Sequence, residues 1–204
     1  MQLPESTPQW LRAASVAEPT LVWLDTCSLP GARDSKRLSG FCNHTEVALC
    51  KAVVGMLQRL GVPGSDIGVT SPYVQQVTSL QQAVHEVFQP DFKDGIPQKS
   101  QAAASSQGNC SARPAVMTID RFQGQDKAAM VVSLVRSNAS KATGDLLQDC
   151  RRINVALTRA KHKVVIVGDS TTVSQVLLLK KVLNTVSRLG TVFQLDAEAL
   201  QGVL

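Results

Sequence analysis

The sequence predicts an α/β domain in which a parallel β-sheet is covered by helices on both faces. Segments with the composition of strands alternate with segments of helical periodicity, an order that produces parallel sheets. The run Val164 to Val167 is wholly apolar, as expected of a strand buried on both faces. A length of 204 residues, 44% of them hydrophobic, suffices for one substantial core, so a single domain is expected.

Each expected element rests on its own local pattern. Asn43 with Glu46 three residues later resembles a helix N-cap, and apolar residues at helical spacing continue until Gly61. A short helix beginning near Arg151 precedes the apolar strand. The expected strands are residues 21–24, 67–70, 115–118, 130–135 and 163–167, and the other expected helices are 44–60, 74–88 and 171–189.

The domain is expected to span residues 19–190. Residues 1–18 are polar and contain prolines, and 191–204 form a weakly patterned tail. Residues 31–40 read as a charged loop. Residues 89–114 carry almost no large apolar side chain and cannot offset the entropy cost of ordering, so we expect a disordered surface insertion there.

Whole-chain composition excludes several classes of protein. The net charge of +5 permits an anionic partner without requiring one. The five cysteines are odd in number and form no C-x-x-C pair, which argues against zinc, an iron–sulfur cluster or a disulfide framework in this chain. No segment approaches the roughly 20 apolar residues that a membrane span requires, and no secretory signal is evident, so no membrane partner is expected.

The segment R-R-I-N-V-A-L-T-R-A-K, residues 151–161, is the most informative stretch. Arg152 and Arg159 lie seven residues apart and project the same way from a helix, while Ile153 and Leu157 can pack on the core. Rigidly held guanidinium groups beside a parallel sheet can neutralise charge that develops on a transferred phosphoryl group. The alternative is an amphipathic helix with a solvated basic face.

Two polar segments follow expected strands, where open α/β sheets bind ligands. The first is T-I-D-R-F-Q-G-Q-D, residues 118–126, in which Gly124 allows close backbone approach to a phosphate or ribose. The second, S-P-Y-V-Q-Q, contains Tyr73, the single tyrosine of the chain. Either could instead be a plain hydrophilic connection.

Taken in order, these three segments resemble motifs IV, V and VI of superfamily 1 helicases of the 5′-to-3′ subclass. Within that group the chain is most similar to the C-terminal RecA-like motor domains of eukaryotic DNA replication ATP-dependent helicase/nucleases, over about residues 22–183. The resemblance implies a RecA-like second helicase domain of the P-loop NTPase type. It also implies roles in DNA replication and repair, through processing of Okazaki flaps and DNA ends.

The resemblance also assigns roles to individual residues. Arg159 matches the arginine finger and Arg152 a second basic contributor, both counted as catalytic. Val77 stands where many relatives carry a basic residue, which is a departure from motif IV. The implied nucleotide-binding residues are Gly124, Gln125, Asp126, Tyr73 and Gln76; the implied nucleic-acid-binding residues are Thr118, Asp120 and Lys161, with Lys141 and Lys163 as further candidate backbone contacts.

The chain lacks parts that such a motor needs. It contains no G-x-x-x-x-G-K-[ST] loop and no Asp-Glu pair ending a strand, so by itself it is not expected to hydrolyse ATP. The resemblance implies that ATP and Mg²⁺ are shared with an upstream RecA-like domain, that a nuclease region with a 4Fe-4S cluster lies further upstream, and that Met1 begins a fragment. It further implies single-stranded or flap DNA as partner, and a nuclear location with a mitochondrial pool.

Other interpretations stay open from the sequence. The same motifs occur in RNA helicases of this superfamily, and only the nuclease region would separate DNA from RNA. The chain could also be a non-catalytic adaptor that keeps the RecA-like fold for docking. A simple nucleotide-binding module is disfavoured because no phosphate-cradling loop is present.

Overall fold

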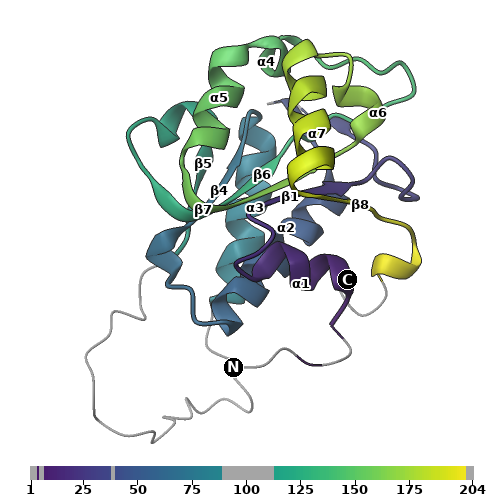
Figure 1. Cartoon of the computed structure of the whole chain (residues 1–204). Coiled ribbons are helices and arrows are strands. Elements are labelled where there is room, and N and C mark those ends of the chain that lie inside the picture. Colours follow the sequence, from purple (N-terminus) through teal and green to yellow (C-terminus); the bar gives the residue numbers. More distant parts are fainter. Residues whose placement is uncertain (1–3, 5–6, 38–39, 89–112, 201–204) are drawn as a thin grey trace, which may run out of the picture.

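The computed structural model describes residues 4, 7–37, 40–88 and 113–200, which form a three-layer α/β structure (Figure 1). Its six-stranded sheet has the order β5-β4-β6-β7-β1-β8, and neighbouring strands are parallel throughout. The predicted parallel sheet is therefore confirmed. The strands are β1 (Leu21–Asp25), β4 (Ile67–Ser71), β5 (Ala115–Thr118), β6 (Lys127–Ser133), β7 (Ala160–Gly168) and β8 (Thr191–Gln194).

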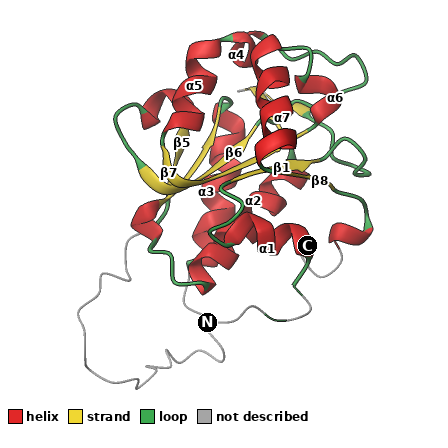
Figure 2. Ribbon diagram, viewed as in Figure 1, coloured by secondary structure: helices red, strands yellow, loops and turns green. Residues whose placement is uncertain are grey.

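Helices cover both faces of the sheet, as the sequence predicts (Figure 2). The first face carries α1 (Gln9–Ser15), α2 (His44–Arg59) and α3 (Val74–Val87), and the second carries α5 (Cys150–Thr158) and α7 (Leu177–Leu189). Side chains alternate between the two faces along each strand. On β7, Val165 and Val167 pack in the first core, whereas Ile166 packs in the second. The strands all run in the same direction, so their C-terminal ends lie along one border of the sheet and their N-terminal ends along the opposite border. We call these two borders the carboxyl edge and the amino edge.

The local signals in the sequence predict α2 closely. The Asn43 side chain accepts a hydrogen bond from the Glu46 backbone N–H at 3.2 Å, so the predicted N-cap is confirmed. The helix ends at Arg59, and the next glycine, Gly61, has a positive φ of 86°. Leu49, Val53 and Leu57 are buried against the sheet, which fixes the helix on the first face.

Five of the described helices and strands were not expected. Residues 1–18 include α1, because Trp10 and Leu11 bury against the first core and the Trp10 indole N–H donates to the Ala199 carbonyl at 2.9 Å. The tail contains β8, which pairs with β1. The charged loop contains a two-stranded hairpin, β2 (Ser35–Arg37) and β3 (Gly40–Cys42). A separate turn, α4 (Asp145–Gln148), precedes α5.

The expected helix over 171–189 is two helices, α6 (Ser170–Val173) and α7. The Asp169 carboxylate caps α6, and the backbone leaves helical geometry at Val176 (φ −94°, ψ 118°) before α7 begins. Most of the predicted insertion, residues 89–112, lies outside the described residues. Single turns of 3-10 helix occur at Gly64–Asp66, Ile119–Phe122 and Glu198–Leu200.

Candidate nucleotide and nucleic-acid sites

Helix α5 carries the two arginines singled out in the sequence. Ile153 and Ala156 anchor it to the second core. Arg152 lies in its first turn and Arg159 at its C-cap, so at 1.5 Å per residue their backbones are about 10 Å apart along the axis. Both side chains turn toward the segment that joins β5 to β6, residues 119–126, which we call the crossover. The predicted common face is confirmed, and it contacts protein as well as solvent.

Arg159 lies at the amino edge. Its Nη1 is 3.0 Å from Oδ1 of Asp126, and its Nη2 donates to the Thr158 hydroxyl at 3.4 Å. Its carbonyl accepts the Lys127 backbone N–H at 2.9 Å, which ties the base of the side chain to the sheet. The side chain is 26% exposed, yet its Nε is buried without a hydrogen-bond partner. The guanidinium therefore keeps unused donors beside a charged partner.

The crossover brings three predicted nucleotide-binding residues to Arg159. Ile119 and Phe122 are buried and fix the crossover over the sheet. Gly124 has a φ of 79°, a conformation that favours glycine, and the backbone N–H of Gln125 donates to the Phe122 carbonyl at 3.0 Å. Gly124, Gln125 and Asp126 are all exposed where the crossover reaches the amino edge.

Arg152 belongs to a second group at the carboxyl edge. Its Nε lies 3.2 Å from Oδ1 of Asp120 and 3.5 Å from Oδ2 of Asp149. Thr118 ends β5 and is paired in register with Ser71 of β4. The structure thus places Arg152 and Asp120 together beside Thr118, and it separates this group from Arg159.

Tyr73 and Gln76 also lie at the carboxyl edge, so they do not join Gly124 and Asp126. The seven residues of β6 separate the two edges by roughly 20 Å, at about 3.3 Å per residue. The fully buried Gln76 side chain accepts from the Asn43 N–H at 2.8 Å and donates to the Ser133 hydroxyl at 2.9 Å and the Asn43 carbonyl at 3.2 Å. Both N–H donors and one of the two acceptor positions of the amide are thereby used within the protein.

The Tyr73 side chain is likewise committed to the protein. Its hydroxyl donates to the Thr143 carbonyl at 3.1 Å, and its ring meets the edge of Phe41 at a centroid distance of 5.6 Å. Burial raises the pKa of the Tyr73 phenol. Val77, the departure from motif IV, is buried in α3. These contacts make Tyr73 and Gln76 parts of the scaffold at the carboxyl edge.

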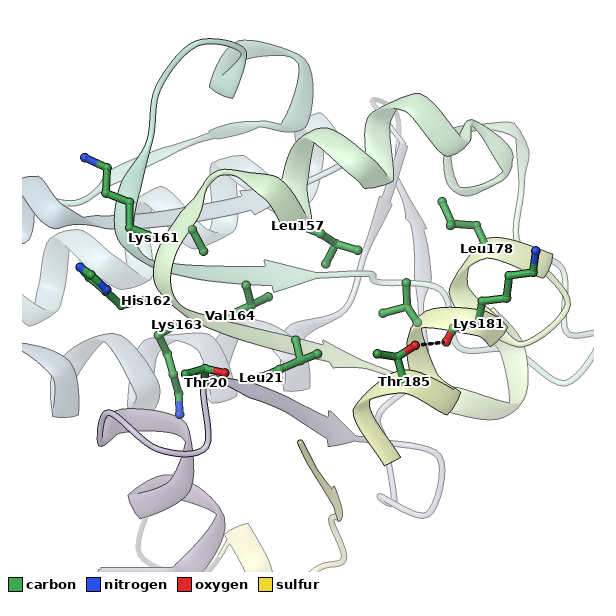
Figure 3. A pocket seen from close by; sticks show the side chains of 12 residues that line it. Thr20, Leu21, Leu157, Lys161, His162, Lys163, Val164, Leu178, Lys181 and Thr185 are labelled. Atoms are coloured by element: carbon green, nitrogen blue, oxygen red, sulfur yellow. Dashed lines mark hydrogen bonds between the residues drawn. The ribbon is translucent and has the colours of Figure 1, made fainter. Parts of the chain in front are cut away.

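Lys161 lies at the amino edge, away from Thr118 and Asp120, because it is the second residue of β7. It is exposed at one end of a groove of about 620 Å³ between α5, β7 and α7 (Figure 3). Leu157, Val164 and Leu178 give the groove an apolar lining, and Lys181 adds a second cation. Lys161 therefore accompanies Arg159 rather than the predicted nucleic-acid residues.

Lys163 is not available as a surface contact, contrary to the prediction. Figure 3 shows its side chain pointing away from the groove toward α1, where the ammonium donates to the Ala13 and Pro19 carbonyls. Only 5% of the residue is exposed, and burial lowers its pKa to about 8. Lys141 is exposed, with a positive φ of 53°.

A buried polar cluster at the carboxyl edge was not anticipated. Oε2 of Glu46 accepts from the Ser133 hydroxyl at 2.6 Å and the Val135 N–H at 2.9 Å, and Ser133 links this carboxyl to Gln76. Glu46 is fully buried, and burial raises its pKa to about 8. The capping position of Glu46 was visible in the sequence, but its burial depends on strands far along the chain.

Neither a membrane helix nor a metal cluster is found in the described part of the chain. No helix there has the length and apolarity to cross a bilayer. No group of three or more His, Cys, Asp or Glu side chains there could hold a metal ion.

The sheet order, the two helical layers and the arginines of α5 define the class of protein as a RecA-like α/β domain. A family model described as an AAA domain matches residues 2–171, and the chain belongs to this family. The chain is also similar to proteins named DNA replication ATP-dependent helicase/nuclease from several organisms. The identity is 32% over 198 residues for Saccharomyces cerevisiae, 31% over 175 for Homo sapiens and 33% over 194 for Arabidopsis thaliana.

These matches cover 96%, 86% and 93% of this chain but only 11%, 14% and 12% of the respective relatives. The resemblance to the C-terminal motor domain of such enzymes is thereby confirmed. Because the chain spans so small a share of each relative, the activity of a whole enzyme is considered only as a proposal.

Proposed function

We propose that this chain is the second RecA-like motor domain of an ATP-dependent DNA helicase/nuclease that acts in DNA replication and repair, including the processing of flaps and DNA ends. In this proposal a preceding RecA-like domain makes most of the contacts with ATP and Mg²⁺. The present chain supplies the arginine finger and part of the single-stranded DNA track. The names of the similar proteins support this proposal. A nuclear location remains a prediction.

The position of Arg159 carries the proposal. A finger must reach out of its own domain while its base stays fixed. Arg159 meets both conditions, because its carbonyl accepts a hydrogen bond from the first residue of β6 and its partly exposed guanidinium is ion-paired with exposed Asp126. An arginine so placed can meet a phosphate bound to a facing domain.

The chemistry assigned to Arg159 is electrostatic. ATP bound between the two domains supplies the phosphoryl group that is transferred to water. The guanidinium of Arg159 then leaves Asp126 and neutralises negative charge on that group, which in comparable enzymes accelerates turnover by about 10³- to 10⁵-fold. Exchange is feasible because Asp126 is 50% exposed and Arg159 26% exposed, so that solvent screens the ion pair and its contribution is only about 0.2–1 kcal/mol.

The proposed DNA track lies on the opposite edge, at Thr118 and Asp120. Arg152 is ion-paired to Asp120, so we assign it a positioning role for that aspartate rather than a direct contact with nucleotide. Backbone contacts supply most of the affinity for a single strand and do not depend on its sequence. Lys161 lies on the amino edge and is left out of this track.

The test uses a protein that joins this chain to its preceding motor domain and measures ATP hydrolysis stimulated by single-stranded DNA. Arg159→Ala should lower kcat by about 10³-fold or more while ATP binding is largely kept. Arg188→Ala, which removes an exposed arginine from the last turn of α7, is the matched control and should be neutral. Normal turnover by the Arg159 variant would contradict the role of Arg159 as an arginine finger and would favour a non-catalytic adaptor.

A further inference from the structure

We propose that the pocket beside the start of α3 receives a single unstacked nucleobase of the bound DNA strand. This inference rests on the proposed function, because it identifies which part of the strand the carboxyl edge holds. The pocket has a volume of about 440 Å³, and no residue named so far as a nucleotide or track contact, apart from Tyr73, lines it.

The walls of the pocket suit a flat, partly apolar ligand. Pro72 and Val74 form an apolar side, and Val74 is 58% exposed although it is a large hydrophobic residue. Phe41 and Arg136 form another wall, with the guanidinium carbon 3.8 Å from the ring centroid. Aromatic rings, guanidinium planes and apolar side chains are the surfaces on which unstacked bases pack.

The wall formed by Phe41 and Arg136 is rigid. The Arg136 Nε lies 3.0 Å from Oδ2 of Asp34, and both side chains are only 8% exposed. The Tyr73 ring packs edge-on against Phe41. A cavity whose walls are held in this way costs little ordering entropy when a ligand enters.

The pocket continues the proposed track. Ser71 is paired in register with Thr118, so Pro72 and Val74 follow directly beside the end of β5. Adjacent strands lie about 4.8 Å apart, which is shorter than the step between neighbouring nucleotides of an extended strand. A strand whose phosphate lies at Thr118 can therefore place a neighbouring base in the pocket.

The charges around the pocket match a phosphate backbone outside it. Gly40 lines the pocket and is paired with Arg37 in the β2–β3 hairpin, and Arg37, Lys36 and Arg33 are all exposed. Asp145 is the acidic residue of the lining, and its carboxylate can accept hydrogen bonds from amino groups on a base edge. Cations outside and a partly aromatic interior, in which Arg136 is ion-paired with Asp34, favour a base in the pocket with its phosphates on the hairpin.

The experiment changes Val74 to Glu in the protein that contains both motor domains. Glutamate is favoured in the first turn of a helix, and α3 has no acidic residue there, so the variant should fold. Leu177→Glu is the matched control, because Leu177 is also exposed and also begins a helix, α7, that has no acidic residue in its first turn. Affinity is measured by fluorescence anisotropy with a single-stranded oligonucleotide and with an abasic oligonucleotide of the same backbone.

Val74→Glu should weaken binding of the normal oligonucleotide by about 5- to 150-fold, the range for loss of one stacked base, whereas Leu177→Glu should leave it unchanged. On the abasic oligonucleotide the loss caused by Val74→Glu should shrink to less than about threefold. In the same protein, Arg37→Ala should reduce the slope of log affinity against log salt by about 0.7, and Arg188→Ala should not.

Two results would overturn the assignment in distinguishable ways. If the parent protein binds DNA and depends on Arg159 for turnover, but Val74→Glu behaves like Leu177→Glu or weakens abasic DNA equally, the base pocket is wrong and the proposed function stands. If the parent protein does not bind single-stranded DNA, the proposed function and the base pocket fail together.

Discussion

Replacing Gln76 by methionine tests whether this side chain supports the fold or faces a ligand. Methionine has a similar length and no hydrogen-bonding amide, so the substitution removes three buried hydrogen bonds with little change in volume. Because the buried amide spends both of its donors and one acceptor position on protein partners, we expect the loss to appear in the free energy of unfolding rather than in ATP affinity.

The magnitude follows from what each partner retains. The Asn43 N–H has Gln76 as its acceptor and is left buried without one, which costs about 1–3 kcal/mol. The Asn43 carbonyl still accepts from the Val47 N–H, and the Ser133 hydroxyl still donates to Glu46, so each of these two losses costs about 0.5–1.5 kcal/mol. The sum is about 4 kcal/mol, within a range of about 2–6 kcal/mol.

The assay is urea unfolding of the 204-residue chain followed by circular dichroism. With a slope of about 2 kcal/mol per molar urea, the urea concentration at the unfolding midpoint should fall by about 2 M. Gln81→Met, on the exposed side of the same helix, removes one hydrogen bond to the Val116 carbonyl and should cost less than about 1 kcal/mol. If the two substitutions lower the free energy of unfolding by the same amount, the buried hydrogen bonds do not hold Gln76 in place. A contact between Gln76 and a ligand would then be the better interpretation.

Two further predictions concern charged groups. Burial raises the pKa of Glu46 from 4.5 to about 8, so the folded state retains a proton that the unfolded state releases, and the free energy of unfolding should fall between pH 4.5 and 8 by an amount on the order of 5 kcal/mol. Glu46→Gln should flatten this dependence in urea titrations at several pH values, and a parent curve that is already flat would contradict the argument. Asp126→Asn and Arg159→Ala, combined in a double-mutant cycle on stability, should show a coupling of about 0.2–1 kcal/mol that vanishes in 1 M salt. A coupling above about 2 kcal/mol would mean that Arg159 is locked in place and cannot act as a finger.

The sequence predicted those helices and strands that are marked by a pattern of neighbouring residues. The N-cap at Asn43 and the apolar run in β7 are such signals, and both are confirmed. Helix α1 and strand β8 were missed because their order depends on distant partners, as when Trp10 bonds the Ala199 carbonyl. Short segments with few apolar residues carry no periodicity strong enough to reveal such contacts.

The sequence predicted the relative positions of site residues where these follow from helical periodicity. It did not predict them where they depend on the topology of the sheet. The common face of Arg152 and Arg159 follows from helical spacing. The distance of Gln76 from Asp126 does not, because it depends on which edge of the sheet each strand end reaches. Lys163 could have been recognised, since alternation along β7 places it on the same face as Val165 and Val167, which pack in the first core.

The crossover joins the two edges that the proposed function assigns to different ligands. Its carboxyl-edge end contacts α5 through Asp120 and Arg152, and its amino-edge end contacts α5 through Asp126 and Arg159. Buried Phe122 holds the segment between these contacts in place. Under the proposed function, exchange of Asp126 for a phosphate would remove the ion pair of Arg159 and leave that of Arg152 with Asp120 in place. The Lys127 backbone N–H, which donates to the Arg159 carbonyl at 2.9 Å, would still hold the amino-edge end of the crossover against the C-cap of α5. Under the proposed function, nucleotide binding would therefore change the side-chain contacts of the crossover without detaching its backbone from α5.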